Sequence, residues 1–275
     1  MIDAEDPGFS PDWLALRESA DAAARAVELL DPVRGRLAGT AKAVIRDLGC
    51  GTGSMGRWLA GRLAGAQHWV LYDRDPELLR HAAATMVDTA ADGSPVTVET
   101  RQHDITALDA DELAGASLVT ASALLDLLTE PEVDRLAGAC VEAKCPALLT
   151  LSVLGRVEFS PADPLDTDLE AAFNAHQRRP VDGRRLLGPD AVDAAADAFA
   201  RRGATVQVRP APWRLGAGQA SLAAQWLDGW VAAACAQRPD LAAPARDDLQ
   251  RRQAAAAAGR LIVVVHHSDL LAQPG

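Results

Sequence analysis

The sequence predicts an α/β protein with one mostly parallel, seven-stranded sheet flanked by helices. Short apolar segments typical of strands alternate along the chain with segments in which apolar residues recur at helical spacing. In addition, the first strand-like segment runs directly into a glycine-rich stretch that opens a helix. Parallel strands need crossover helices, and each such helix buries its apolar side on the sheet. A Rossmann-like arrangement with helices on both faces is therefore expected.

The individual elements follow in order. The first predicted helix has Ser10 as its N-cap and Pro11 at its first position, and we expect Asp31-Pro32 to end it. The predicted strands are 43–48, 68–72, 96–102, 118–121, 147–153, 204–208 and 261–266. Helices are predicted at 54–63, 76–86, about 129–142 and 189–202, the third of them with a capping box formed by Thr129 and Glu132.

Two insertions interrupt the alternation after residue 153. Residues 155–188 are predicted to form a long polar connection with a weak helical signal at 169–177. Residues 210–259 contain predicted helices near 219–237 and 245–258, and Trp213, Trp226 and Trp230. Long insertions after strand ends often carry function, so we expect a helical lid there. The single domain divides into an N-terminal helical cap (1–40), a cofactor-binding core (41–153) and an acceptor-side part (154–275).

Composition excludes several classes of partner. A net charge of −11 with scattered basic residues argues against nucleic acid. No long apolar segment suggests a membrane span or a secretion signal, and the four cysteines lack a C-x-x-C spacing, so we expect a cytoplasmic protein with reduced thiols. We expect no metal, because the adjacent His266 and His267 would point to opposite faces of a strand. No pattern in the sequence determines the oligomeric state, so both a monomer and a homodimer stay open.

The stretch RDLGCGTGSMGRW, residues 46–58, holds two overlapping nucleotide-loop patterns. Gly49, Gly51 and Gly53 have the spacing of a loop for S-adenosylmethionine, whereas Gly51, Gly53 and Gly56 have that of a dinucleotide pyrophosphate site. Asp47 favours the first, because a carboxylate beside the loop would repel two phosphates but attract the positive ammonium and sulfonium groups of S-adenosylmethionine. Gly56 is then expected to be a close-packing position in the helix.

These residues resemble the class I S-adenosylmethionine-dependent methyltransferases. VIRDLGCGTG at 44–53 is similar to their first motif, WVLYDRDPELL at 69–79 to their ribose motif and RQHDI at 101–105 to their adenine motif. SLVTASALLDLL at 117–128 is similar to the strand and helix that follow. The resemblance covers about residues 40–153. It implies methyl transfer from S-adenosylmethionine, with S-adenosylhomocysteine as the product.

The resemblance also implies roles for individual residues. Asp47 would lie near the methionine amino group, with the backbone of the three loop glycines, Gly49, Gly51 and Gly53, against the cofactor. Asp73 would bind the ribose hydroxyls, and Asp104 and Ile105 would lie at the adenine. Ser122, just past the fourth strand, would lie near the reacting methyl group.

The acceptor side is predicted from the residues of the insertions. His176 is the best candidate for a general base, because it follows the fifth strand on the carboxyl side of the sheet, where ligands bind in open α/β folds. Asp126, expected at the start of the helix after the fourth strand, competes for that role. Asn174, Arg178 and Trp213 are candidate substrate-binding residues.

We predict methyl transfer to a small molecule, with oxygen as the expected acceptor atom. Transfer from a sulfonium depends mostly on positioning and water exclusion, so base assistance is optional. Two alternatives stay open. One is a nicotinamide-dependent oxidoreductase, and the other is a non-catalytic protein that binds S-adenosylmethionine on the same fold.

Overall fold

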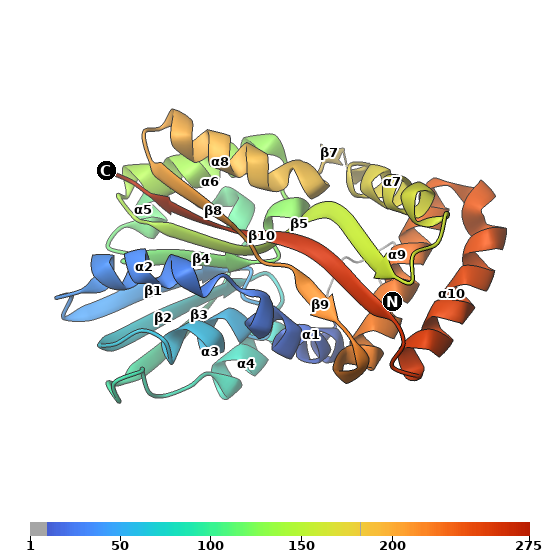
Figure 1. Cartoon of the computed structure of the whole chain (residues 1–275). Coiled ribbons are helices and arrows are strands. Elements are labelled where there is room, and N and C mark those ends of the chain that lie inside the picture. Colours follow the sequence, from blue (N-terminus) through green and yellow to red (C-terminus); the bar gives the residue numbers. More distant parts are fainter. Residues whose placement is uncertain (1–9, 182) are drawn as a thin grey trace.

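One central sheet organises the chain in the computed structural model, which describes residues 10–181 and 183–275. Its strands are β1 (Lys42–Leu48), β2 (Ala66–Asp73), β3 (Val96–Gln102), β4 (Leu118–Ser122), β5 (Ala147–Ser160), β8 (Thr205–Pro210), β9 (Trp213–Leu215) and β10 (Ile262–Gln273). The order across the sheet is β3-β2-β1-β4-β5-β10-β8, and β9 pairs with part of β10 (Figure 1). Strands β1 to β5 pair in parallel, whereas β10 is antiparallel to β5, β8 and β9.

Helices cover both faces, as the alternation of the sequence predicted. One apolar cluster joins the sheet to α2 (Leu30–Leu37), α3 (Ser54–Ala60) and α4 (Pro76–Thr85). The other joins the opposite face to α5 (Ala110–Leu113), α6 (Glu130–Glu142) and α8 (Ala191–Arg201). The capping box of Thr129 and Glu132 is present at the start of α6. Within the described ranges, no helix combines the length and apolar character needed to cross a bilayer.

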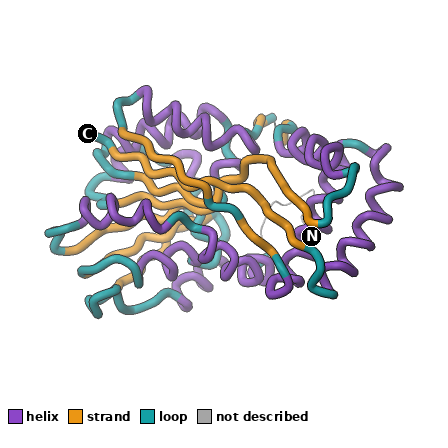
Figure 2. The backbone as a smooth tube through the Cα atoms, viewed as in Figure 1, coloured by secondary structure: helices purple, strands orange, loops and turns teal. Residues whose placement is uncertain are grey.

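A third apolar cluster lies beyond the ends of the shorter strands. There the long strands β5 and β10 continue as a pair, visible in Figure 2, and pack with α1 (Pro11–Ala24), α7 (Asp166–Gln177), α9 (Ala220–Gln237) and α10 (Ala242–Ala257). Trp226 and Trp230 stack in α9 with ring centroids 5.5 Å apart, and Phe159 lies 5.4 Å from Trp230. These aromatic rings therefore belong to the core of this third apolar cluster.

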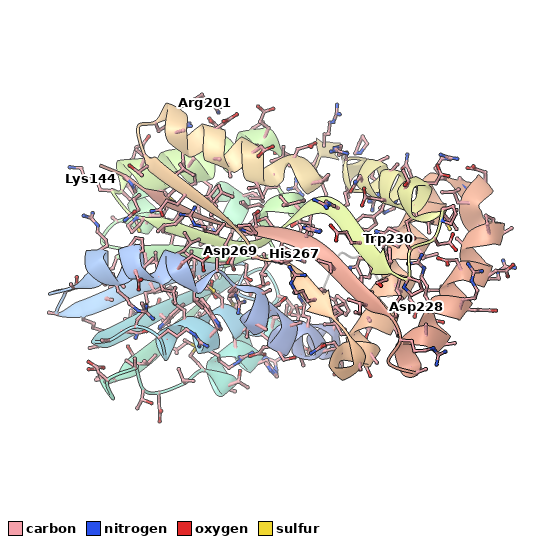
Figure 3. All side chains as sticks on the ribbon, in the orientation of Figure 1. Lys144, Arg201, Asp228, Trp230, His267 and Asp269 are labelled. Carbon is pink, nitrogen blue, oxygen red and sulfur yellow. The ribbon has the colours of Figure 1, made fainter. Side chains whose placement is uncertain are left out.

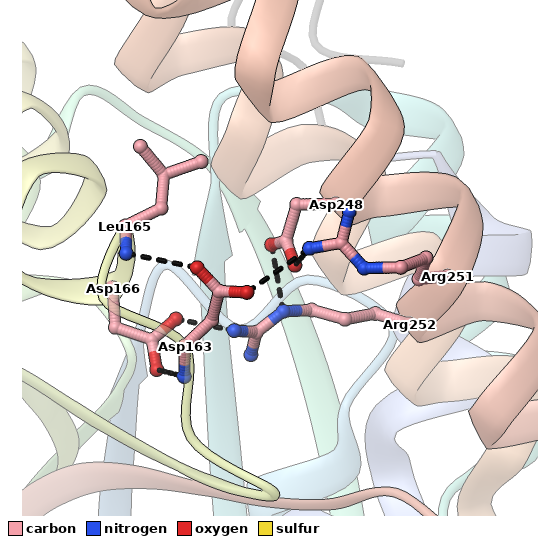
Figure 4. A network of polar contacts seen from close by, with 6 residues as sticks. All are labelled: Asp163, Leu165, Asp166, Asp248, Arg251 and Arg252. Atoms are coloured by element: carbon pink, nitrogen blue, oxygen red, sulfur yellow. Dashed lines mark hydrogen bonds and ion pairs between the residues drawn. The ribbon is translucent and has the colours of Figure 1, made fainter.

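Charged side chains tie α10 to the corner between β5 and α7 (Figure 4). The guanidinium of Arg252 donates to Asp248 at 2.7 Å and to Asp166, and it lies 3.9 Å from the centroid of the Phe159 ring. Arg251 donates to Asp163 at 3.0 Å and to Asp248 at 2.9 Å. Because Arg252 and Asp248 are buried, each stabilises the other's charge where water cannot.

The N-terminal helix differs from the prediction. It ends at Ala24, the backbone turns at Arg25 and Ala26, and a short 3-10 turn (Val27–Leu29) leads into α2. The expectation that Asp31-Pro32 ends a helix is wrong, because Pro32 lies in the first turn of α2. A proline is tolerated there, since its missing N–H would have no partner in the first turn.

The first insertion also differs from the prediction. Residues 155–160 continue β5, and β10 runs to Gln273, because the two strands pair with each other over this length. The extension looked like a polar loop because its exposed face carries charged residues, as the alternating burial of β5 shows.

Short elements fill the remaining connections. Asp126 lies in a 3-10 turn (Leu125–Leu127) that precedes α6, and residues 188–190 form another such turn before α8. Pro180–Val181 and Arg184–Arg185 pair as β6 and β7.

Candidate cofactor and acceptor site

The glycine loop joins β1 to α3 at the carboxyl edge of the parallel strands. Gly49, Gly51 and Gly53 all have positive φ angles, of 61°, 54° and 84°. This left-handed backbone is accessible to glycine at little cost and strains other residues. A Cβ at Gly49 would also meet Leu124 at 3.0 Å. Gly56 plays a different part, because a Cβ there would lie 2.7 Å from the Met86 side chain, so it is the close-packing position that was predicted.

Asp47 lies one residue before the end of β1 and is 1% exposed. Its Oδ1 accepts a hydrogen bond of 2.7 Å from the Thr120 hydroxyl on β4, whereas Oδ2 has no partner among the described residues. Burial raises the pKa of this carboxyl from 3.8 to about 7. Arg46 points to the other face of the sheet, where it donates to the Tyr72 hydroxyl and the Ala114 carbonyl. The site therefore contains one buried carboxyl with a free oxygen.

The other acidic candidates hold backbone at neighbouring strand ends. Asp73, at the end of β2, accepts from the N–H of Gly51 at 2.9 Å and from that of Asp75 at 3.0 Å, which fixes the loop to β2. Asp104 is exposed and caps the 3-10 turn that contains Ile105, and its bonds from the N–H and hydroxyl of Thr106 lower its pKa. Ile105 is half-buried beside this turn.

Helix α1 lies over the glycine loop. Leu14 would touch a Cβ on Gly51 at 3.2 Å. Glu18 accepts two hydrogen bonds from Arg57 of α3, at 2.8 and 2.6 Å, and the guanidinium of Arg57 lowers the pKa of Glu18. The first helix is thus bound to the helix that the loop opens, and its Leu14 side chain lies against the loop at Gly51.

At the end of α1 the chain turns inward. Arg25 donates to the Ser122 hydroxyl at 3.1 Å, so Ser122 faces this segment from the end of β4. The N–H of Ala26 and that of Leu151 each donate to Asp269 of β10 at 2.8 Å. Burial raises the pKa of Asp269 to about 6. Asp269 therefore joins the N-terminal segment to Leu151 of β5, where the register between β5 and β10 shifts.

Asp126 follows β4 in the 3-10 turn beside the loop, since the neighbouring Leu124 is the residue that a Cβ on Gly49 would touch. Burial raises the pKa of Asp126 to about 6, and the positive charge of Arg17 opposes that rise. This carboxyl is therefore mostly ionised at neutral pH and is a strong enough base to accept a proton there.

Trp213 lies under α1 and is 2% exposed. Its indole N–H donates to Asp21 at 2.9 Å, Arg17 lies 4.8 Å from its ring centroid, and the His267 ring lies 5.2 Å away. His267 and Asp269 lie close together on β10 (Figure 3). Burial and the charge of Arg17 lower the pKa of His267 to about 3, so its imidazole is neutral.

Two of the three candidates in and just after α7, Asn174 and Arg178, have structural partners. Asn174 donates to the Gly155 carbonyl at 2.7 Å, and its buried Oδ1 has no partner among the described residues. Arg178 donates to both carboxylate oxygens of Asp190, at 2.6 and 2.7 Å. His176 is half-buried in the last turn of α7, where burial lowers its pKa. Among the described residues no cluster suited to a metal ion occurs.

Comparison with known proteins identifies the core. Residues 45–145 match the family model of a methyltransferase domain. The chain carries a class I S-adenosylmethionine-dependent methyltransferase domain. The strand order, with the antiparallel β10 between β5 and β8, is that of this class. Fold class and cofactor, as predicted from the sequence, are thereby confirmed.

Two solved structures that are similar to this chain illustrate the comparison, and the first of them supports the fold of the methyltransferase. A cyclopropane synthase from Mycobacterium tuberculosis is similar over 96% of this chain and 95% of that chain, with a TM-score of 0.52 and 14% identity. A methyltransferase from Geobacter sulfurreducens, in complex with S-adenosylhomocysteine, is similar over 97% of this chain and 99% of that chain, with a TM-score of 0.44 and 14% identity. No curated protein matches the sequence.

The residues of the methyltransferase fit the cofactor. Buried polar atoms almost always have partners, yet Asp47 Oδ2, two nitrogens of Arg25, His267 Nδ1 and Ser152 Oγ have none among the described residues. They belong to β1, β5, β10 and the end of α1, which meet at this edge of the sheet. Unpaired charged and polar atoms beside a glycine loop suit a charged, polar ligand. When bound, S-adenosylmethionine supplies a methyl group activated by a sulfonium.

Three residues of this region escaped the sequence analysis. Arg25 follows three alanines at the end of α1, and nothing in the neighbouring sequence indicated that it would be buried. Asp269 is the acidic residue within the apolar last strand. His267 was considered only as a metal ligand together with His266, and that pair was rejected.

Proposed function

We propose that the methyltransferase transfers the methyl group to an oxygen atom of a small-molecule acceptor, with Asp126 as the general base. The observation that carries this proposal is the position of Asp126, a carboxyl with a pKa of about 6 in the turn that begins after Leu124, the residue that a Cβ on Gly49 would meet at 3.0 Å. A hydroxyl acceptor must lose its proton as the new bond forms, and a base whose pKa lies just below neutrality is suited to take it.

On the cofactor side, Asp47 would hold the ammonium group, Asp73 the ribose hydroxyls and Asp104 with Ile105 the adenine. Support for Asp47 comes from its unpartnered Oδ2, and support for Asp73 from its place at the end of β2, next to the loop. Ser122 would lie beside the reacting group. It is the last residue of β4, the strand that pairs with β1, which carries Asp47, and that leads into the turn of Asp126.

On the acceptor side, we propose a region below α1, between the turn of Asp126 and β10. Arg17 acts electrostatically on both Asp126 and His267, which supports a location near both. Trp213 would form an apolar wall there. His176, Asn174 and Arg178, in and just after α7, would shape the rim, and the structural bonds of Asn174 and Arg178 favour positioning over proton transfer for those two residues. The cytoplasmic location of the protein and its assembly as a homodimer stay predictions.

The test combines binding and turnover. Calorimetry should show binding of S-adenosylhomocysteine by the purified protein, and hydroxyl-bearing metabolites should then be screened for methylation. Asp126→Asn should lower kcat about 100-fold or more without changing the affinity for S-adenosylhomocysteine. The exposed Glu130→Gln, nearby on α6, is the matched control and should keep full kcat.

Each alternative gives a different outcome. Tight binding of NAD without binding of S-adenosylhomocysteine would indicate an oxidoreductase. Binding of S-adenosylhomocysteine without methylation of any acceptor would indicate a non-catalytic binding protein. Full kcat in Asp126→Asn would remove Asp126 as the base, and His176→Ala would then be examined for the same loss.

A further inference from the structure

Two cavities adjoin at the amino edge of the parallel strands. The first, which we call the polar cavity, has a volume of about 210 Å³, and its polar lining consists of Arg36, Thr40, Ser117 and Lys144. The second, which we call the apolar cavity, has a volume of about 470 Å³, and Leu37 and Thr40 line both. Their walls include residues that precede β1, β2, β4 and β5, whereas the glycine loop follows β1. The cavities therefore lie at the edge of the sheet opposite the cofactor loop.

The edge around these cavities is basic on a chain whose net charge is −11. Within the described part of the chain, no acidic residue lines either cavity. Both lysines of the chain lie at this edge, since Lys42 begins β1 and Lys144 shortly precedes β5. Figure 3 shows Lys144 at the opposite end of the molecule from Trp230.

The excess of positive charge lies in the polar cavity. Arg36 and Lys144 make no ion pair with a described residue, and the charge of the neighbouring Glu142 acts on Arg202. The carboxyl-terminal ends of α2 and α6, where these two cations lie, contribute about half a negative charge each. About one positive charge in the polar cavity is therefore left without compensation.

Hydrogen-bond donors meet at the same cavity. Arg36 Nη2 donates to the Lys144 carbonyl at 3.3 Å, so the guanidinium lies beside the backbone of Lys144. The Ser117 hydroxyl accepts from the Val44 N–H at 3.1 Å, and its own hydrogen has no acceptor among the described residues. Cationic and hydroxyl donors together suit the oxygens of a phosphate group.

The apolar cavity is closer to neutral. Arg34 at its wall pairs with Asp31 at 2.9 Å, and Asp92 accepts from the N–H of Gly65 at 3.0 Å. Its volume lies within the range of about 300 to 1,000 Å³ that is usual for small-molecule sites. Its aliphatic side chains, which suit an apolar organic group, belong to Leu37, Ala38, Leu63, Ala64 and Ala91.

The backbone of Lys144 adds an independent observation. Lys144 follows α6 in a left-handed conformation, with φ at 52°. Its N–H donates to the Val141 carbonyl at 3.0 Å, and that of Cys145 donates to the Cys140 carbonyl at 2.9 Å. Glycine is favoured at this position of a helix end, because a side chain strains the backbone there. The corresponding residues after α2, α8 and α10 are Gly39, Gly203 and Gly259.

We propose that the two cavities form one binding site for a phosphate ester that carries an apolar organic group. Arg36, Lys144 and Ser117 bind the phosphate in the polar cavity, and the organic group occupies the apolar cavity. This role also explains why a lysine takes a backbone position that favours glycine. The ligand is distinct from the cofactor and the acceptor, because the site lies at the opposite edge of the sheet.

The first experiment uses the unmodified protein and 1-naphthyl phosphate as the probe. Calorimetry compares it with inorganic phosphate and with 1-naphthol, each of which lacks one half of the probe. The probe should bind about tenfold or more tightly than either, because a charge-assisted hydrogen bond or a buried ring is lost. Absence of this preference overturns the proposal. Displacement of the probe by S-adenosylhomocysteine would place it in the cofactor loop and overturns the proposal as well.

The second experiment tests the phosphate half with variants of the two lysines. Lys144→Gln and Lys144→Gly should each weaken the probe about tenfold, and Lys144→Gly should also raise the thermal midpoint, because glycine suits the left-handed backbone. Lys42→Gln is the matched control, since it removes the same charge at the same edge but lines neither cavity. It should keep the affinity within about twofold of the unmodified protein. Full affinity in Lys144→Gly, or an equal loss in Lys42→Gln and Lys144→Gln, overturns the role of Lys144.

The third experiment tests the organic half. Ala64→Trp places a large side chain on the exposed wall of the apolar cavity and should weaken 1-naphthyl phosphate about tenfold. Binding of inorganic phosphate should stay unchanged, because the polar cavity is not filled. If Ala64→Trp leaves the affinity for 1-naphthyl phosphate unchanged, the ring does not occupy the apolar cavity and the proposal of one two-part site is overturned.

Discussion

Asp47→Asn should make the protein more stable at alkaline pH while weakening its cofactor binding. The buried carboxyl has a pKa of about 7 in the folded protein, against 3.8 for the free group. Between these two pH values the folded state holds a proton that the unfolded state releases, so the free energy of unfolding falls as pH rises. Asparagine keeps an oxygen that accepts from Thr120 and has no charge to desolvate.

The magnitude follows from this rise in pKa. At about 1.4 kcal/mol for each tenfold change in the ionisation constant, the ionised carboxyl costs about 4 kcal/mol at high pH. Roughly 2.5 kcal/mol of that cost arises between about pH 5 and about pH 8. Urea unfolding of both proteins at these two pH values should therefore show the variant gaining roughly 2.5 kcal/mol over the wild type.

The comparison has a control and a clear refutation. Other groups with raised pKa values, Asp126 and Asp269, titrate in both proteins and cancel in the difference. The exposed Asp111→Asn removes the same charge and should show no such gain. If Asp47→Asn and the wild type lose stability in parallel as pH rises, then Asp47 is ionised at little cost, and our account of its environment is wrong.

Three further predictions concern the contacts around the site. Glu18→Gln should raise the dissociation rate of S-adenosylhomocysteine about fivefold in stopped-flow measurements, because the pair with Arg57 that holds α1 over the loop contributes about 1 kcal/mol. Arg252→Met should lower the free energy of urea unfolding by roughly 3 kcal/mol, because Asp248 loses a buried partner at 2.7 Å. Gly155→Ala should lower the thermal midpoint and cost about 2 kcal/mol or more, because φ is +67° there and the new Cβ would lie 2.5 Å from Asn174 Oδ1.

Each of these has a result that would contradict it. An unchanged dissociation rate in Glu18→Gln would mean that α1 does not limit release. Unchanged unfolding of Arg252→Met would show that Arg251, which also donates to Asp248, compensates fully. Gly155→Ala with wild-type stability would mean that β5 adjusts around residue 155, where its register with β10 shifts, without cost.

The sequence alone determined the core of this protein. Alternating helix and strand periodicity fixed a parallel sheet, because local patterns dictate which side of each element is buried. The glycines at 49, 51 and 53 located the cofactor loop, since their left-handed conformations are a local property of the backbone. Asp47 was singled out by its place next to that loop, and the sign of its charge selected the methyl donor.

Only the tertiary structure decided how the loop is covered. Arg25 meets Ser122 across 97 positions of the chain, and the N–H of Ala26 meets Asp269 across 243. The extension of β5 beyond residue 153 likewise depends on pairing with β10, far along the chain. Such contacts leave no periodic trace in the sequence, because they depend on how distant elements pack. The burial of Arg25 likewise becomes visible only when the distant elements around it are assembled.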